Sequence, residues 1–187
     1  MTKQNNIREV LANHRIIPVV TFNSLDEVDA KINTLLKNDV NCIEITLRTQ
    51  VAYDAIQKVK EKYGNEITVG MGTVVLEAQI HKAMELQVDF MVSPGLHSGL
   101  AQQLMDSKIA FIPGVATPSD IINGLQFEWD TFKFFPAYLF GGVEALKTYG
   151  QVFPNLKFCP TGGLTEASYR DYLALENVIS VGGSWIK

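Results

Sequence analysis

Short apolar runs recur along the chain at nearly even intervals, and most of them are followed by turn or polar residues. Most are rich in Val, Ile or Phe, a composition typical of strands buried in a parallel sheet. The runs cover residues 16–22, 42–46, 67–71, 90–93, 110–113, 131–135, 157–159 and 178–181. The pattern therefore predicts eight strands.

Amphipathic stretches lie between these runs. Residues 25–37 place apolar side chains at positions 28, 32, 35 and 36, close to the repeat of a helix, and Ser24 with Glu27 forms a capping-box pattern before them. Residues 51–63 also carry one apolar face. Thr117 followed by Pro118 is typical of the first residues of a helix. The sequence predicts seven helices between the strands, one of them over residues 166–174.

Strict alternation of strand and helix predicts parallel strands joined by right-handed crossovers. Eight such units predict an α/β fold of the (β/α)₈ TIM-barrel type, formed as a single domain by residues 1–187. A doubly wound open sheet is the alternative. It has no enclosed centre, which the charged residues inside the strands, described next, would need. The sequence stops after the eighth strand, so the final C-terminal helix is missing from the pattern. We expect either a truncated chain or a neighbouring subunit that covers this flank.

A lysine inside the sixth run is the first sign of chemistry. Lys133 lies between Phe132 and Phe134, and side chains along a strand alternate between its two faces. Because two phenylalanines suit the side that meets the helices, we expect Lys133 to point inward. A desolvated lysine favours its neutral form, which is the nucleophile that a Schiff-base enzyme needs. The alternative is a lysine at a strand end that reaches out to water.

Glu44 repeats this pattern between Ile43 and Ile45 in the second run. An inward carboxylate beside an inward lysine can transfer protons during catalysis. Alternatively, the two charges only neutralise one another as a structural pair. Arg48 follows at the carboxyl end of the same strand, where barrel enzymes have their active sites, and a guanidinium there suits a substrate carboxylate.

Glycine pairs follow the last two runs. Gly162 and Gly163 come after the seventh run, and Gly183 with Ser184 comes after the eighth. In barrel enzymes these two loops commonly bind phosphate, because glycine lets backbone N–H groups approach an anion. Residues 70–73 end the third strand with two glycines and Thr73. Thr73 thus brings a hydroxyl to the mouth of the barrel, the end where the carboxyl ends of the strands meet.

Composition and charge narrow the class of protein. Hydrophobic residues make up 47% of the chain and charged residues 19%, which excludes a disordered chain. The net charge of −4 and the lack of a basic cluster argue against nucleic acid as a partner. No apolar run could span a membrane, and the polar N-terminus has no secretory signal. Cys42 and Cys159 are typical of thiols in a reduced compartment, so we expect a cytoplasmic protein. The three histidines are scattered and predict no metal site.

Seven stretches in this order resemble one known family, the class I 2-keto-3-deoxy-6-phosphogluconate (KDPG) aldolase / 4-hydroxy-2-oxoglutarate (KHG) aldolase family. They are residues 44–49 (EITLRT), 70–74 (GMGTV), 92–95 (VSPG), 112–118 (IPGVATP), 132–137 (FKFFPA), 159–163 (CPTGG) and 181–185 (VGGSW). The resemblance implies a (β/α)₈ barrel that assembles as a homotrimer. It also implies an enzyme that needs neither a metal nor an organic cofactor and whose substrate is a small keto acid or sugar-acid phosphate.

The resemblance also implies residue roles. Lys133 occupies the position of the Schiff-base lysine, and Glu44 occupies that of the general acid/base. Arg48 and Thr73 fall where the family holds the carboxylate of the keto acid. Gly162, Gly163 and Ser184 fall where it holds the distal phosphate, with Gly183 in the same loop, and Pro94, Phe135 and Thr161 line the pocket. KDPG would give pyruvate and glyceraldehyde 3-phosphate, and KHG would give pyruvate and glyoxylate.

One departure from the family lies at Met71, where the family usually has Ala, and we expect Met71 to narrow the mouth or shift a neighbour. Two other functions stay open. One is a phosphosugar epimerase or isomerase on the same barrel. The other is a non-catalytic phosphometabolite-binding barrel in which Lys133 and Glu44 are a structural pair.

Overall fold

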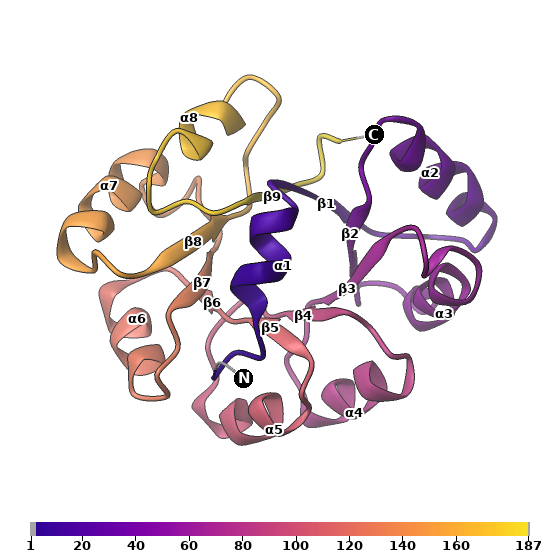
Figure 1. The fold of residues 1–187 in the computed structure, drawn as a ribbon, viewed down its shortest axis with the longest axis horizontal. Helices are drawn as coiled ribbons and strands as arrows, with labels where there is room; N and C mark the ends of the chain where they lie inside the picture. The colour runs from indigo at the N-terminus through magenta and orange to yellow at the C-terminus, as the bar shows by residue number, and fades with distance from the viewer. Residues whose placement is uncertain (1–2, 187) are drawn as a thin grey trace.

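In the computed structural model, which describes residues 3–186, parallel strands curl around a central axis and helices cover their outer side (Figure 1). The strands are β1 (Ile16–Val20), β2 (Cys42–Thr46), β3 (Thr68–Gly72), β4 (Phe90–Val92), β5 (Ala110–Ile112), β6 (Gly114–Val115), β7 (Thr131–Phe134), β8 (Lys157–Pro160) and β9 (Val181–Gly183). The helices are α1 (Ile7–Asn13), α2 (Asp26–Lys37), α3 (Ala52–Tyr63), α4 (Glu77–Glu85), the 3₁₀ turn η1 (Ser98–Leu100), α5 (Ala101–Asp106), α6 (Pro118–Leu125), α7 (Gly142–Val152) and α8 (Tyr169–Leu173).

The strands form two hydrogen-bonded groups. One has the order β5-β4-β3-β2-β1-β9 and the other β6-β7-β8, and all neighbouring strands are parallel. Two isolated parallel bridges, Phe158 with Val178 and Thr161 with Gly182, link the β8 side to the β9 side. The predicted α/β class, with parallel strands and intervening helices, is confirmed.

Two strand predictions need correction. The fifth run is divided at Pro113, which has no amide hydrogen to donate, so β5 pairs with β4 while β6 pairs with β7. The last strand is displaced from the predicted 178–181 to Val181–Gly183, because the glycines themselves pair with β1. Glycine has low strand propensity, and for this reason the apolar pattern missed it.

Most helix predictions agree with the structure to within a few residues. α6 begins at Pro118, and the Thr117 hydroxyl accepts a hydrogen bond from the Asp120 amide as predicted for a cap. At α2 the predicted capping box of Ser24 and Glu27 does not form, because the helix begins after Leu25, one residue later than predicted. The Ser24 hydroxyl accepts from the Asp26 amide, and the Glu27 carboxylate accepts from the Asn23 amide. No helix within residues 3–186 is long and apolar enough to cross a membrane.

α1 was not predicted, and it closes one end of the curled sheet. Figure 1 shows it lying across the middle of the strands. The spacing of Ile7, Val10 and Leu11 is the helical signal that the sequence analysis did not use. The Gln4 side chain fastens the chain ahead of α1 to β7, since it accepts from the Thr131 amide at 3.0 Å and donates to the Thr131 carbonyl at 2.7 Å.

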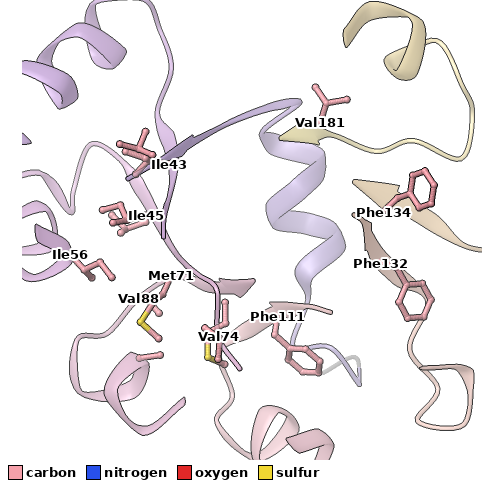
Figure 2. Close-up of a cluster of buried hydrophobic side chains, with 14 of the residues drawn as sticks. Ile43, Ile45, Ile56, Met71, Val74, Val88, Phe111, Phe132, Phe134 and Val181 are labelled. Carbon is pink, nitrogen blue, oxygen red and sulfur yellow. The ribbon is translucent and has the colours of Figure 1, made fainter. Parts of the chain in front are cut away.

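The strands separate two apolar layers. Their outer side chains pack against the helices, and Figure 2 shows Ile43, Ile45, Phe132 and Phe134 among them. The inner layer contains Ile7 and Leu11 of α1 together with Ile17, Cys42, Phe90, Val92, Ala110, Ile112 and Cys159. The outward orientation predicted for the two isoleucines and the two phenylalanines is therefore confirmed.

Met71 belongs to the outer layer, where it is fully buried (Figure 2). The expectation that it narrows the mouth was wrong, because position 71 faces the helices while Gly70 and Gly72 face the interior. A larger residue at position 71 is thus accommodated in the packing between sheet and helices.

We predict that Leu11→Ala will lower the free energy of unfolding by about 2–5 kcal/mol, because Leu11 is 0% exposed and its removal leaves a cavity in the inner layer. Leu76→Ala, at a position that is 60% exposed, is the matched control and should change stability by less than about 0.5 kcal/mol. Urea unfolding followed by circular dichroism measures both. Equal effects of the two substitutions would show that α1 does not pack as described.

Candidate active site

Two opposite charges meet inside the curled sheet. The Lys133 Nζ of β7 donates to the Glu44 Oε1 of β2 at 3.3 Å, and each side chain is only 5% exposed. Because side chains alternate along a strand and the neighbours of these two residues point outward, Lys133 and Glu44 point into the interior. The predicted inward orientation of both residues is confirmed.

Small residues and an aromatic ring shape the space around this pair. A Cβ at Gly72 would collide with the Glu44 carboxylate, so only glycine leaves room for that side chain. The Lys133 Nζ lies 5.0 Å from the centre of the Phe135 ring, a cation–π distance. Below the pair, Leu11, Phe90 and Ile112 line a space of about 10 Å³. These three buried side chains give the pair an apolar floor.

A cavity of about 270 Å³ lies at the ends of the strands above the pair. Its lining residues are Val19, Thr21, Arg48, Phe135, Thr161, Gly162, Gly163, Leu164, Gly183 and Ser184. Thr161 also lines the small space that holds Lys133 and Glu44, so the pair lies at the inner end of the cavity. Seven residues singled out from the sequence therefore surround one cavity.

A larger groove of about 720 Å³ runs beside β1 and α2 and shares Val19, Thr21 and Ser184 with the cavity. The charged residues that line this groove are Glu27 and Lys31 on α2. Neither Lys133 nor Glu44 lines it. The smaller cavity is the candidate site because it combines a guanidinium with the buried pair.

The backbone of the two glycine loops has the freedom that an anion site requires. Gly162 and Gly163 have φ values of 93° and 77°, in the left-handed region that favours glycine. A Cβ at Gly163 would also come within 2.5 Å of the Tyr138 side chain. The loop can therefore keep this shape only with glycine, and it presents bare backbone to the cavity.

Apart from the buried pair, Thr73 and Pro94 are predicted site residues that do not line the cavity. Thr73 directly follows Gly72, whose position faces Glu44, and its φ of 67° is rare for a β-branched residue. Such strain concentrates at functional sites. Pro94 lies in the loop after β4, where its carbonyl packs against Gly114.

The cysteines have no nucleophilic role in this geometry. Burial raises the pKa of the Cys159 thiol to about 11, and burial also raises the pKa of Cys42. Both thiols are therefore protonated at neutral pH, and the interpretation of Cys159 as a packing residue is confirmed. Within residues 3–186 no three His, Cys, Asp or Glu side chains are grouped so that they could hold a metal ion.

The sequence analysis missed three lining residues, Val19, Thr21 and Leu164. The first two extend the inward-facing series that begins at Ile17, so the two-residue repeat of β1 could have found them. Leu164 lies in a loop, where no such repeat exists.

The chain is similar to known proteins along almost its whole length. The family model described as KDPG and KHG aldolase matches residues 7–187. The KHG/KDPG aldolase of Escherichia coli (strain K12) is 37% identical over 183 residues, which is 98% of this chain and 85% of that protein. The 2-dehydro-3-deoxy-phosphogluconate aldolase of Zymomonas mobilis is 39% identical over 171 residues, 91% of this chain and 81% of that protein.

A solved structure shows the same arrangement of elements. It is the KDPG aldolase from Legionella pneumophila with pyruvate captured as a covalent carbinolamine intermediate. The TM-score is 0.93 at 38% sequence identity, and the match covers 96% of this chain and 87% of that chain.

We predict that Gly72→Ala will lower the free energy of unfolding by about 1–3 kcal/mol, because the added methyl group must displace the Glu44 carboxylate. Gly95→Ala is the matched control, since a Cβ there meets no atom within 4 Å. Chemical denaturation compares the two variants. Wild-type stability of Gly72→Ala would mean that the carboxylate does not occupy this position.

Proposed function

The chain belongs to the family of KDPG and KHG aldolases, and from this premise we propose that Lys133 and Glu44 carry out a reversible aldol cleavage in the cavity above them. The protein is an aldolase, a lyase that acts through a Schiff base. Its substrate is KDPG, which gives pyruvate and glyceraldehyde 3-phosphate, and KHG is a second substrate, which gives pyruvate and glyoxylate. Family membership sets aside the epimerase and the binding protein as alternatives. The observation that carries the residue assignment is the buried Lys133–Glu44 pair at the inner end of the cavity.

The reaction begins at the lysine. As a free amine, Lys133 attacks the C2 carbonyl carbon of the keto acid to give a carbinolamine, and loss of water gives an iminium ion. Glu44, directly or through one water, takes the proton of the C4 hydroxyl while the C3–C4 bond breaks. The electrons of that bond move into the iminium and form an enamine, and the aldehyde leaves. Protonation at C3 and hydrolysis then release pyruvate and restore the lysine.

Two anionic groups of the substrate fix its orientation. Arg48 lines the cavity and suits the C1 carboxylate through paired hydrogen bonds. Thr73 is assigned to the same carboxylate, and its strained backbone supports a role in the site. The loops with Gly162, Gly163, Gly183 and Ser184 suit the distal phosphate, and Phe135 and Thr161 shape the pocket. Pro94 is assigned to the same pocket from the family resemblance alone.

The proposal extends to the complete architecture. The chain forms one domain, a (β/α)₈ barrel, and the two parallel bridges between the β8 and β9 sides support closure of the sheet. It assembles as a homotrimer, which the exposed Tyr138, Leu139 and Phe140 after β7 support, because a run of exposed apolar side chains is typical of an interface. It works in the cytoplasm, in keeping with two free buried thiols and a phosphorylated substrate.

We predict that incubation of the wild type with pyruvate and sodium borohydride will yield a stable adduct of pyruvate size by intact-protein mass. Lys133→Ala and Lys133→Arg should yield none, because neither has a primary amine there. The arginine variant keeps a positive partner for Glu44, so it also tests a folded protein. Lys157→Ala, which removes a half-buried lysine of β8 that donates to the Glu176 carbonyl, should still form the adduct. An adduct on Lys133→Arg would contradict the assignment.

Glu44→Gln separates imine formation from bond cleavage. The amide keeps the size of the side chain but cannot take a proton, so we expect turnover of KDPG to fall by about 10²–10⁴-fold while the pyruvate adduct still forms. A coupled assay for pyruvate release and the mass measurement give the two readings. Glu61→Gln on the surface of α3 is the control. Wild-type turnover of Glu44→Gln would assign the proton transfer to another group.

A further inference from the structure

Thr21 lines the active-site cavity and has no role in the proposed reaction. It follows β1, where positions 17, 19 and 21 face inward, and it shares the cavity with Arg48 and Ser184. Its Oγ1 lies 2.7 Å from the Oγ1 of Thr46, a fully buried residue of β2. Thr46 stands between Glu44 and Arg48 in the inward series of its strand.

The contacts of the two hydroxyl groups constrain where their protons lie. A threonine hydroxyl has one proton to donate and two lone pairs that accept. The Thr46 Oγ1 donates to the Val20 carbonyl at 3.3 Å. Both bonds form together only when the proton between the two hydroxyls comes from Thr21, and we take this arrangement as the premise of the inference. With its proton committed to Thr46, the Thr21 hydroxyl can present only a lone pair to the cavity.

An acceptor at this place differs from the other polar groups of the cavity. The Arg48 guanidinium and the backbone of the glycine loops donate hydrogen bonds, which suits a carboxylate and a phosphate. A lone pair repels such anions and matches an alcohol O–H instead. Thr21 therefore suits a substrate hydroxyl that lies between the two anionic ends.

We infer that Thr21 is a specificity-determining residue that accepts a hydrogen bond from the C5 hydroxyl of KDPG. This inference rests on the proposed function. Both substrates of that function carry a C4 hydroxyl, which faces Glu44 in the reaction, but only KDPG has a further hydroxyl at C5. At that carbon KHG has a carboxylate, which Thr21 cannot serve. Thr21 thus favours the phosphorylated sugar acid over the shorter keto acid.

The test compares kcat/KM for KDPG and for KHG in Thr21→Val, which keeps the shape of the side chain and removes the acceptor. We expect kcat/KM for KDPG to fall about 10-fold, because the C5 hydroxyl then loses its partner, and kcat/KM for KHG to change less than about 2-fold. Thr21→Ser restores the acceptor and should recover most of the activity on KDPG. Thr34→Val, which removes a hydroxyl on α2 that bonds the Ala30 carbonyl, is the matched control and should leave both values unchanged.

Equal losses on both substrates, or no recovery in Thr21→Ser, would overturn the inference and leave Thr21 a packing residue. The pyruvate adduct at Lys133 forms without any C5 hydroxyl, so it should form on Thr21→Val as on the wild type. A wild type that forms no adduct and cleaves neither substrate would instead contradict the proposed function. The two failures are therefore distinguishable.

Discussion

The contact between the Lys133 ammonium and the Glu44 carboxylate determines what the surrounding residues can be. Two charges that are each 5% exposed need space, a partner and a dry floor. Glycine at position 72 provides the space, because any side chain there would overlap the carboxylate. Leu11, which α1 carries across the end of the sheet, helps to provide the floor. The Gln4 side chain then ties the start of the chain to β7, the strand that carries the lysine.

Chemistry and recognition occupy different parts of this fold. Lys133 and Glu44, the pair proposed to react, lie on β7 and β2, whose outer side chains Ile43, Ile45, Phe132 and Phe134 are buried against the helices (Figure 2). Elements that are packed in this way hold a site more precisely than loops do. The groups assigned to the ends of the substrate lie at strand ends and in loops, where Gly162 and Gly163 have backbone conformations that favour glycine. Changes in the loops can therefore alter the choice of substrate while the chemical step stays in place.

Much of this arrangement was predictable, because strands and helices leave different periods in a sequence. The alternation of side chains along a strand predicts that Lys133 and Glu44 point inward. The glycine loops at two strand ends predict a binding site at the same end of the barrel. The misses have physical reasons. Met71 was expected to narrow the mouth because the family usually has Ala there, although the two-residue repeat of the strand turns position 71 toward the helices. The last strand was misplaced because two of its three residues are glycines. Thr21 was missed although the two-residue repeat that begins at Ile17 reaches it, because a threonine at a strand end carries no charge that marks it as a site residue.

The location of the pair is itself an argument for chemistry over structure. Replacing a buried ion pair with apolar side chains of similar volume is often neutral or stabilising by about 1–4 kcal/mol, since charges lose their hydration on burial. The neighbours of this pair include Phe90 and Ile112, so an apolar pair would join a layer that already exists. Stability of the fold alone therefore does not explain two charges at this place. A reaction that needs an amine and a proton acceptor 3.3 Å apart, out of water and open on one side to a cavity, does explain them.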